Sequence, residues 1–199
     1  LSETPGPENE IYAAECEELA QKLQQSFKNV FLNEHGYLLD YVDGQMQDWS
    51  VRPNQIFAIA LDFSPLDLKE RKRVLDICTR ELVTPKGVRS LSPKSGGYNP
   101  LYVGQQTQRD FAYHNGTAWP WLTGFYLEAY LRIYKMSGVN FIERQLIGFE
   151  EELFYHCVGT IPELFDGNPR FSGRGAISFA MNVSGLLRAI NILDKYTRE

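Results

Sequence analysis

Long apolar runs are missing from this 199-residue chain, and its one run of consecutive basic residues, Arg71-Lys72-Arg73, is short. No segment reaches the roughly 20 consecutive apolar residues that a membrane-spanning helix needs, so we expect no membrane association. Lys and Arg number 20 against 25 Asp and Glu, and the net charge is −5. Because nucleic-acid phosphates bind to basic faces, the acidic balance predicts no nucleic-acid partner.

Cysteine and histidine are also scarce. Cys16, Cys78 and Cys157 are widely spaced and odd in number, which gives no disulfide framework. All three stand at apolar positions of helical patterns, so we expect buried free thiols. The three histidines lie far apart and form no metal-ligand cluster, which predicts no bound metal.

No secretory signal peptide is visible, and together with the free thiols this favours a cytoplasmic protein. Asn115-Gly116-Thr117 and Asn182-Val183-Ser184 match the acceptor pattern for N-glycosylation. In a cytoplasmic protein these two matches carry no function.

Aromatic residues, in contrast, make up 13% of the chain, and the hydrophobic fraction of 43% is typical of a globular protein. A chain of this length can form one domain with a sizeable core. Aromatic rings fill such cores, and their faces also suit the apolar faces of sugars. The position of the aromatic residues along the chain therefore matters more than their number.

Apolar residues recur at helical spacing through most of the chain. Residues 1–9 contain two prolines and a glycine and are predicted to be a linker or disordered arm. Residues 10–199 are predicted to be one helical domain. Its first helix is expected at about 10–32. A second is expected to begin at Ser64-Pro65 and to end before Pro85, and three more are expected at about 119–137, 139–157 and 176–196. The first helix is expected to bury Tyr12, Cys16, Leu19, Leu23, Phe27 and Val30. In the second, Ser64 is expected to be the N-cap, and the buried stripe is expected to be Leu68, Leu75, Cys78 and Leu82.

Extended structure is only weakly indicated. Residues 37–42 form a short apolar run that fits either a strand or an extended segment. Residues 56–61 are a further short apolar stretch, and 84–116 are polar, glycine-rich and without a regular pattern. We therefore expect an all-α protein with strands limited to short hairpins. Helices joined by alternately long loops favour a helical toroid or solenoid with its site on one rim.

One loop segment, 113–121, combines tyrosine, histidine, asparagine and two tryptophans. A sugar site needs aromatic faces for the ring and polar groups for the hydroxyls, and Tyr113, His114, Trp119 and Trp121 offer both. The alternative is a tightly packed loop with satisfied polar groups. His114 is interpreted as an orienting hydrogen-bond partner more readily than as a proton-transfer group.

Glu163 follows Pro162 and precedes two large apolar residues, beyond the end of a predicted helix. It therefore forms no surface pair along a helix, and an acid in partly apolar surroundings is a candidate general acid or base. A capping or hydrogen-bonding role is the alternative. Asp166 precedes Gly167 and fits a turn, so it ranks second.

An irregular segment around residues 48–55 carries further candidates. Trp49 is interpreted as a sugar platform rather than a core residue. Arg52, next to Pro53, either binds a substrate hydroxyl or carboxylate or forms a structural ion pair.

These segments, taken together, resemble the C-terminal amylo-α-1,6-glucosidase domain of glycogen debranching enzymes, in its bacterial and archaeal form. The resemblance covers roughly residues 40–195, and the order and spacing of several motifs make it specific. The matching strings are Arg52-Pro53-Asn54-Gln55, Thr79-Arg80-Glu81-Leu82 with Leu91-Ser92-Pro93, residues 113–121, residues 161–167 and Gly175-Ala176.

The resemblance implies an (α/α)6 barrel, with helices in two concentric rings, that hydrolyses α-1,6-linked glucose at α-glucan branch points with inversion. It implies that Glu163 is the general base and that no cofactor is required. The substrate, a glycogen or α-glucan oligosaccharide, would be bound by Trp49, Arg52, Asn54, Gln55, Tyr113, His114, Trp119 and Trp121.

This sequence departs from the family in one respect. The family's general acid, an aspartate near a Trp-Met-Asp-type motif upstream, has no match here, and a full barrel needs about twice this chain. We therefore expect the second half of the barrel, about six to seven helices, whose partner is the remainder of the parent enzyme. An apolar patch should mark the missing helices, and a homodimer is one way to cover it.

Two other interpretations stay open. One is a related α-glucosidase of the trehalase or glucoamylase kind, since the glucose pocket looks alike in each. The other is a non-catalytic helical domain that binds a glycan or a protein. In the enzyme interpretation, Glu163, Trp119, His114 and Arg52 should converge on one concave face.

Overall fold

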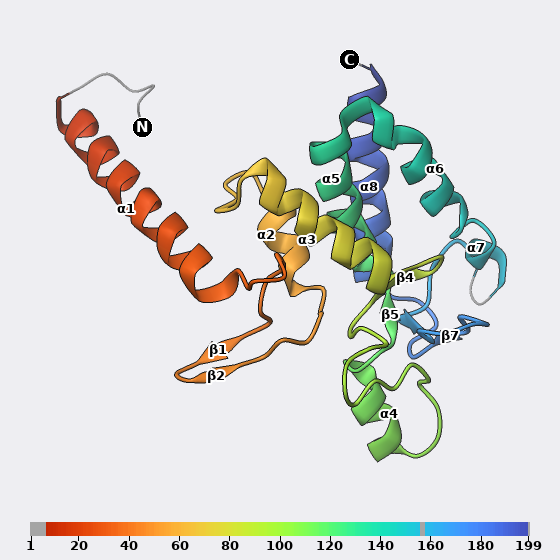
Figure 1. Cartoon of the computed structure of the whole chain (residues 1–199). Helices are drawn as coiled ribbons and strands as arrows, with labels where there is room; N and C mark the ends of the chain where they lie inside the picture. Colours follow the sequence, from red (N-terminus) through yellow and green to blue (C-terminus); the bar gives the residue numbers. More distant parts are fainter. Residues whose placement is uncertain (1–6, 156–157, 199) are drawn as a thin grey trace.

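The computed structural model describes residues 7–155 and 158–198. Within them the chain forms eight α-helical segments, six of which have eight or more residues, and a short 3-10 turn, η1 (Lys135–Gly138). The mostly helical fold expected from the sequence is confirmed (Figure 1). The helices are α1 (Pro7–Phe31), α2 (Asn54–Ala60), α3 (Leu68–Glu81), α4 (Gln106–Tyr113), α5 (Trp121–Tyr134), α6 (Val139–Ile147), α7 (Glu152–Tyr155) and α8 (Ala180–Arg198).

The core is built around α5, which packs against α8 on one side and α2 and α3 on the other. Two glycines allow α5 and α8 to approach closely. A Cβ atom on Gly124 would collide with the carbonyl oxygen of Gly185, and a Cβ on Gly185 would collide with the backbone of Trp121. The apolar residues at this centre, among them Tyr126, Leu127 and Leu131, are 0–1% exposed.

The start of α3 differs from the prediction. Its N-cap is Asp67 and not Ser64: the Asp67 carboxylate accepts from the backbone N–H of Glu70, whose side chain accepts from the N–H of Asp67. This reciprocal pair satisfies two otherwise unpaired donors, and Ser64 only precedes it. Leu75, Cys78 and Leu82 are fully buried as expected, but Leu68 is exposed.

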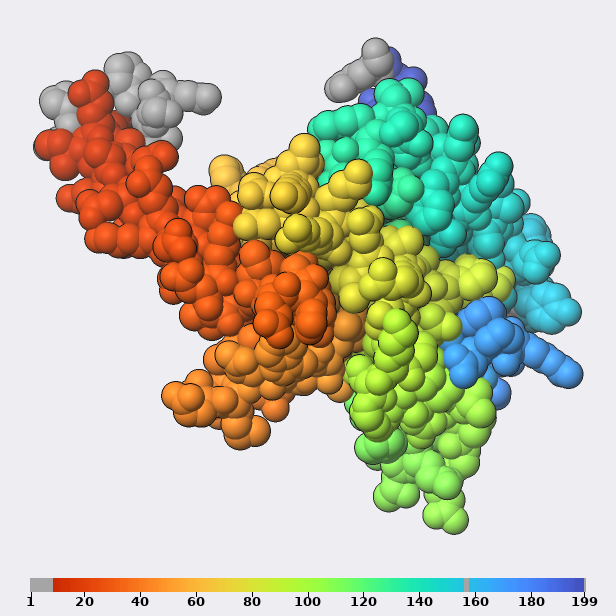
Figure 2. Space-filling view, viewed as in Figure 1, coloured from red at the N-terminus to blue at the C-terminus, as the bar shows by residue number. Residues whose placement is uncertain are grey.

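Helix α1 projects from the body of the molecule as an arm (Figures 1 and 2). It begins at Pro7, so residues 7–9 belong to the helix and not to a linker, while residues 1–6 lie outside the described residues. The predicted buried stripe is wrong for most of its length: Tyr12, Cys16, Leu19, Leu23 and Val30 are exposed. Near its C-terminal end the helix does reach the core, where Phe27 and Phe31 pack.

Strands are short, but they exceed the isolated hairpins expected. β1 and β2 form one hairpin. Five further strands of two or three residues pair antiparallel in the order β3-β4-β5-β6-β7, so the prediction of hairpins alone is wrong. Single backbone pairs between distant loops do not leave the alternating pattern that reveals a strand in sequence. The strands are β1 (Val42–Asp43), β2 (Met46–Gln47), β3 (Val83–Thr84), β4 (Gly87–Arg89), β5 (Ala118–Trp119), β6 (Leu164–Phe165) and β7 (Gly173–Arg174).

Several predicted boundaries also change. Residues 56–61 fall largely in helix α2, and 84–116 contain β4 and the helix α4. Of the strand expected at 37–42, only an isolated bridge at Leu38 and the first residue of β1 remain. The helix predicted at 139–157 divides into α6 and α7, and the last helix starts at Ala180 rather than near 176.

The cysteines behave differently from one another. Cys78 is a buried free thiol, as predicted, and burial raises its pKa. Cys16 is exposed on α1, so its predicted burial is wrong. Cys157 lies outside the described residues.

An apolar groove of about 720 Å³ runs between α6 and α8. Leu146, Ile161 and Leu186 form part of its floor, and Leu187 and Ile190 on its wall are 59% and 50% exposed. We refer to it as the α6–α8 groove. Such a surface is the kind of apolar patch that the sequence predicted for an incomplete barrel.

Candidate functional site

A second cavity, of about 490 Å³, collects most of the predicted sugar-binding residues. We call it the aromatic pocket. Of the predicted residues, its wall includes Arg52, Asn54, Tyr113, His114, Trp119 and Trp121. Asp40, Phe57, Ser90, Phe179 and Met181 also contribute. Aromatic faces and polar groups thus surround one volume that is large enough for a small sugar.

Three rings from one segment form the aromatic wall. The Tyr113 and Trp119 rings meet edge to face with centroids 4.8 Å apart, and His114 stacks on Trp119 at 5.8 Å. The Trp119 indole N–H donates to the Thr117 hydroxyl at 3.1 Å, which fixes the ring. Because Trp119 is only 6% exposed and its neighbours are bonded in place, the wall is formed before a ligand arrives.

The small sheet brings the second motif to the first. Ala118 in β5 pairs with Phe165 in β6, although the two are 47 positions apart. Glu163 immediately precedes β6 and is therefore held next to the 113–121 segment. This pairing explains how loops that are distant in sequence come to share a site.

Glu163 is half-buried and bonded on both carboxylate oxygens. The Tyr113 hydroxyl donates to Oε1, and the backbone N–H of Ala176 donates to Oε2 at 2.8 Å. Gly175, at φ +72°, lies so close that a Cβ atom there would collide with the carboxylate. Glu163 does not itself line the aromatic pocket, but Tyr113, which does, connects it to the pocket wall.

The surroundings of Tyr113 and His114 keep these two residues of the aromatic pocket neutral. Burial, and then the hydrogen bond to Glu163, raise the pKa of Tyr113, so its hydroxyl keeps the proton that it donates. Burial and the nearby Arg52 charge lower the pKa of His114, so the imidazole is neutral at pH 7. A neutral, aromatic wall suits an uncharged ligand.

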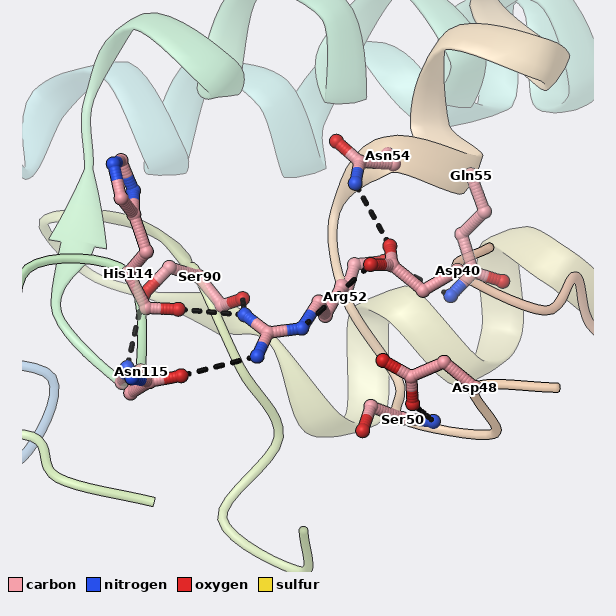
Figure 3. Close-up of polar contacts among 10 residues, drawn as sticks. Asp40, Asp48, Ser50, Arg52, Asn54, Gln55, Ser90, His114 and Asn115 are labelled. Carbon is pink, nitrogen blue, oxygen red and sulfur yellow. Dashed lines mark hydrogen bonds and ion pairs between the residues drawn. The ribbon is translucent and has the colours of Figure 1, made fainter. Parts of the chain in front are cut away.

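Arg52 uses its guanidinium to hold the pocket together (Figure 3). Its Nη1 donates to the carbonyl oxygens of His114 at 2.6 Å and Ser90 at 3.1 Å, and its Nη2 donates to Asn115 Oδ1 at 3.0 Å. Its Nε lies 3.7 Å from Asp40 Oδ2. The guanidinium therefore clamps three segments, which favours the structural alternative over a direct bond to substrate.

Replacing Arg52 by lysine is expected to lower the thermal unfolding midpoint by about 3–8 °C, because an ammonium group cannot reach these acceptors at once. Differential scanning calorimetry would measure it. Arg144→Lys, on an exposed position of α6, is the matched control and should leave the midpoint unchanged. Equal midpoints for both variants would show that the clamp contributes no stability.

Asp40 was missed by sequence reasoning. Its carboxylate lines the aromatic pocket and accepts from the Asn54 side-chain amide at 2.8 Å. Burial raises the pKa of Asp40, against the opposing effects of Asn54 and Arg52. A single aspartate inside the short apolar run 37–42 gives no signal of its own, and only its contact with Asn54 in the matched motif could have pointed to it.

Asn182 was also missed, except as part of a glycosylation pattern. It is fully buried in the first turn of α8. Its amide donates at 2.6 Å to the carbonyl oxygens of both Pro162 and Glu163, and its Oδ1 accepts from the N–H of Trp121 at 3.0 Å. One side chain thus joins the backbone at Glu163 to the backbone at the pocket wall.

Other predicted residues lie elsewhere. Gln55 is buried and serves the backbone, donating to Arg52 O at 3.0 Å and accepting from Leu38 N. Trp49 lies in a separate depression that shares no lining residue with the aromatic pocket. Asp166 is buried in an ion pair with Arg174 at 2.8 Å, so it is bonded within the sheet region.

A mostly helical fold that carries an aromatic pocket beside a fixed carboxylate is that of a glycosidase-like protein. The amylo-alpha-1,6-glucosidase family model matches residues 6–188, and the chain belongs to that family. A stretch of 109 residues, 50% of the chain, is 35% identical to the glycogen debranching enzyme of Saccharomyces cerevisiae and covers 7% of that protein.

The fold resembles part of a solved toroid. The neutral trehalase of Saccharomyces cerevisiae matches with a TM-score of 0.59 and 16% identity, over 90% of this chain and 32% of the trehalase. At that identity the likeness concerns the fold, which is thus similar to part of an α/α toroid. The chain spans less than a third of either relative's length.

No group of three or more His, Cys, Asp or Glu side chains among residues 7–155 and 158–198 is arranged to hold a metal ion. In the same part of the chain, no helix has both the length and the apolar character to cross a membrane.

Proposed function

We propose that this chain is the C-terminal part of a glycoside hydrolase that removes α-1,6-linked glucose from branch points of glycogen or a related α-glucan. Family membership supports the substrate class. The observation that carries the proposal is the placement of Glu163 against Tyr113, a residue of the aromatic pocket. A glucose unit would stack on the aromatic wall, within reach of a fixed carboxylate.

The proposed mechanism is a single displacement in which Glu163 deprotonates the attacking water. Each carboxylate oxygen accepts one hydrogen bond in the structure, from Tyr113 and from Ala176. Because each oxygen has two lone pairs, one remains to receive the proton. The two donors also fix the direction of that lone pair, which is what a general base requires.

An inverting enzyme needs a second carboxyl group about 6.5–9.5 Å from the base, to protonate the leaving oxygen. We propose that the remainder of the parent enzyme supplies it. Asp166 already forms an ion pair with Arg174. Asp40 accepts a hydrogen bond from Asn54 and forms an ion pair with Arg52. Asp40 is better placed to accept a hydrogen bond from a sugar hydroxyl. In this arrangement the parent's earlier helices would cover the α6–α8 groove, and a homodimer is the alternative.

Sugar binding by the 199-residue chain tests the pocket directly. Trp121→Ala is expected to weaken binding of a glucosyl-branched maltooligosaccharide at least about tenfold, about 1.4 kcal/mol, because the half-buried ring lines the pocket. Isothermal titration calorimetry measures the affinity. Phe63→Ala, which removes a ring that is 99% exposed elsewhere, is the control. Unchanged affinity in Trp121→Ala would place the sugar outside the aromatic pocket.

The substrate panel separates this function from its alternatives. The parent enzyme should release glucose from a branched limit dextrin faster than from trehalose or maltose. Preference for trehalose or for linear ends would favour a related α-glucosidase. Sugar binding without any hydrolysis by the parent would favour a binding module.

A further inference from the structure

Trp49 lies in a depression of about 420 Å³ that is separate from the aromatic pocket. Segments around residues 35–37 and 49–51, the end of α3 and residues 92–95 enclose it. The side chains that matter here are His35, Tyr37, Trp49, Arg80, Glu81 and Lys94. The sequence suggested Trp49 as a platform for the substrate sugar, but in the fold it lines a depression of its own.

The aromatic side of this depression is held in a fixed arrangement. The Tyr37 hydroxyl donates to the carbonyl oxygen of Trp49 at 3.1 Å, and the Asn33 side chain accepts from the N–H groups of His35 and Tyr37. The His35 ring stacks on Tyr37 at 6.3 Å and meets Trp49 edge to face at 6.0 Å. Trp49 nevertheless remains 42% exposed, so part of its apolar ring is presented to solvent.

The polar side of the depression contains matched charges. Glu81 is 7% exposed and accepts from Ser92 Oγ at 2.5 Å and from Lys94 Nζ at 2.9 Å, while Arg80 Nε lies 3.9 Å away. Burial opposes ionisation of Glu81, but the bonds from Ser92 and Lys94 outweigh it and lower the pKa. A buried carboxylate within the depression repels an anion, while the exposed ends of Arg80 and Lys94 still donate hydrogen bonds. This combination suits a neutral, polyhydroxylated ligand.

We propose that this depression is a second α-glucan site, in which Trp49 stacks on a glucose unit and the side chains of Arg80 and Lys94 donate to its hydroxyls. The ligand class rests on the proposed function, whereas the site itself rests on the geometry above. Two contacts on one polymer raise its residence time through effective concentration, with no change in either contact. The second site would hold a linear stretch of the glucan while a branch enters the aromatic pocket.

Fluorine NMR of the 5-fluorotryptophan-labelled chain can separate the two sites, because the protein has only three tryptophans. Maltoheptaose, which lacks a branch, is expected to shift the Trp49 resonance with its own saturation curve, and Trp121→Ala should leave that curve unchanged. Trp49→Ala should weaken maltoheptaose binding about tenfold and leave the response of Trp119 and Trp121 to a branched oligosaccharide intact. Trp49→Phe, which keeps a ring, should restore most of the affinity.

Each contrary result has a distinct meaning. If the chemical shift of Trp49 does not change at saturating maltoheptaose while that of Trp121 responds to the branched ligand, the second site is refuted and the proposed function is not. A Trp49 curve that disappears in Trp121→Ala makes it part of the aromatic pocket and also overturns the proposal. Displacement by inorganic phosphate at comparable affinity would identify an anion site instead. If no glucan changes the chemical shifts of Trp119 and Trp121, the proposed function itself is refuted.

Discussion

Replacing Glu163 by glutamine in the parent enzyme is expected to lower turnover of a branched limit dextrin by about 10²–10⁴-fold, the usual contribution of a general base. The fold should persist, because the amide is nearly isosteric with the carboxylate. Its oxygen can still accept from the N–H of Ala176, and its NH₂ can donate to the Tyr113 hydroxyl once that group rotates. The amide cannot take a proton from water, so the loss should fall on kcat and leave glucan affinity almost unchanged.

Chemical rescue makes the test specific. Azide is an anion that needs no deprotonation, so it should partly restore the rate of Glu163→Gln and have no effect on the unmodified enzyme. Glu151→Gln, at an exposed position just before α7, is the matched control and should keep full activity. The 199-residue chain alone should show no measurable hydrolysis if, as we propose, the remainder of the parent enzyme supplies the second carboxyl group. Full activity of Glu163→Gln would end the assignment of the base.

Replacing Asn182 by leucine is expected to have the second largest effect, this time on stability and turnover together. The new side chain has the same number and branching of heavy atoms but leaves two carbonyl oxygens and the Trp121 N–H without their partner. Unpaired buried groups cost about 1–3 kcal/mol, so the unfolding midpoint should fall by about 5–10 °C. Because the Glu163 backbone loses its anchor, kcat should fall more than KM changes.

Asn191→Leu provides the control for this experiment, since it makes the same substitution at an exposed position of the same helix. Its midpoint and kcat should match those of the unmodified protein. A destabilised Asn182→Leu enzyme whose kcat at low temperature is normal would show that Asn182 supports the fold but does not position Glu163.

The sequence predicts the helices best where burial is set by neighbours close in the chain. The buried positions of α3 and the interior of α5 follow from spacing, as Leu75, Cys78 and Leu122 illustrate. Helix α4 was missed because Phe111 is exposed and only Ala112 is buried, so no apolar stripe exists to detect. The burial of α1 was mispredicted for the opposite reason. Its apolar residues have the spacing of a packed helix, but spacing cannot show whether a partner surface is present.

The candidate site could be predicted in composition but not in its connections. Residues 113–121 carry a mixture typical of a sugar pocket, and the structure gathers Tyr113, Trp119 and Trp121 around one cavity. The roles of Asp40 and Asn182 depend on contacts between segments far apart in the chain, which a single sequence does not reveal. Trp49 illustrates the same point. It is close to Arg52 in the sequence, yet the two residues line different cavities.

The hydrogen bonds of Asn182 and Asn115 have a practical consequence for producing the protein. Both residues head glycosylation patterns, and the structure uses both side-chain amides internally: Asn182 binds two carbonyl oxygens, and Asn115 donates to Phe111 O at 2.7 Å while accepting from Arg52. A glycan on either nitrogen would remove these bonds, and one on Asn182 would have to occupy space that is fully filled. Modification during secretion would therefore compete with folding, so expression in a host cytosol is the route to homogeneous material.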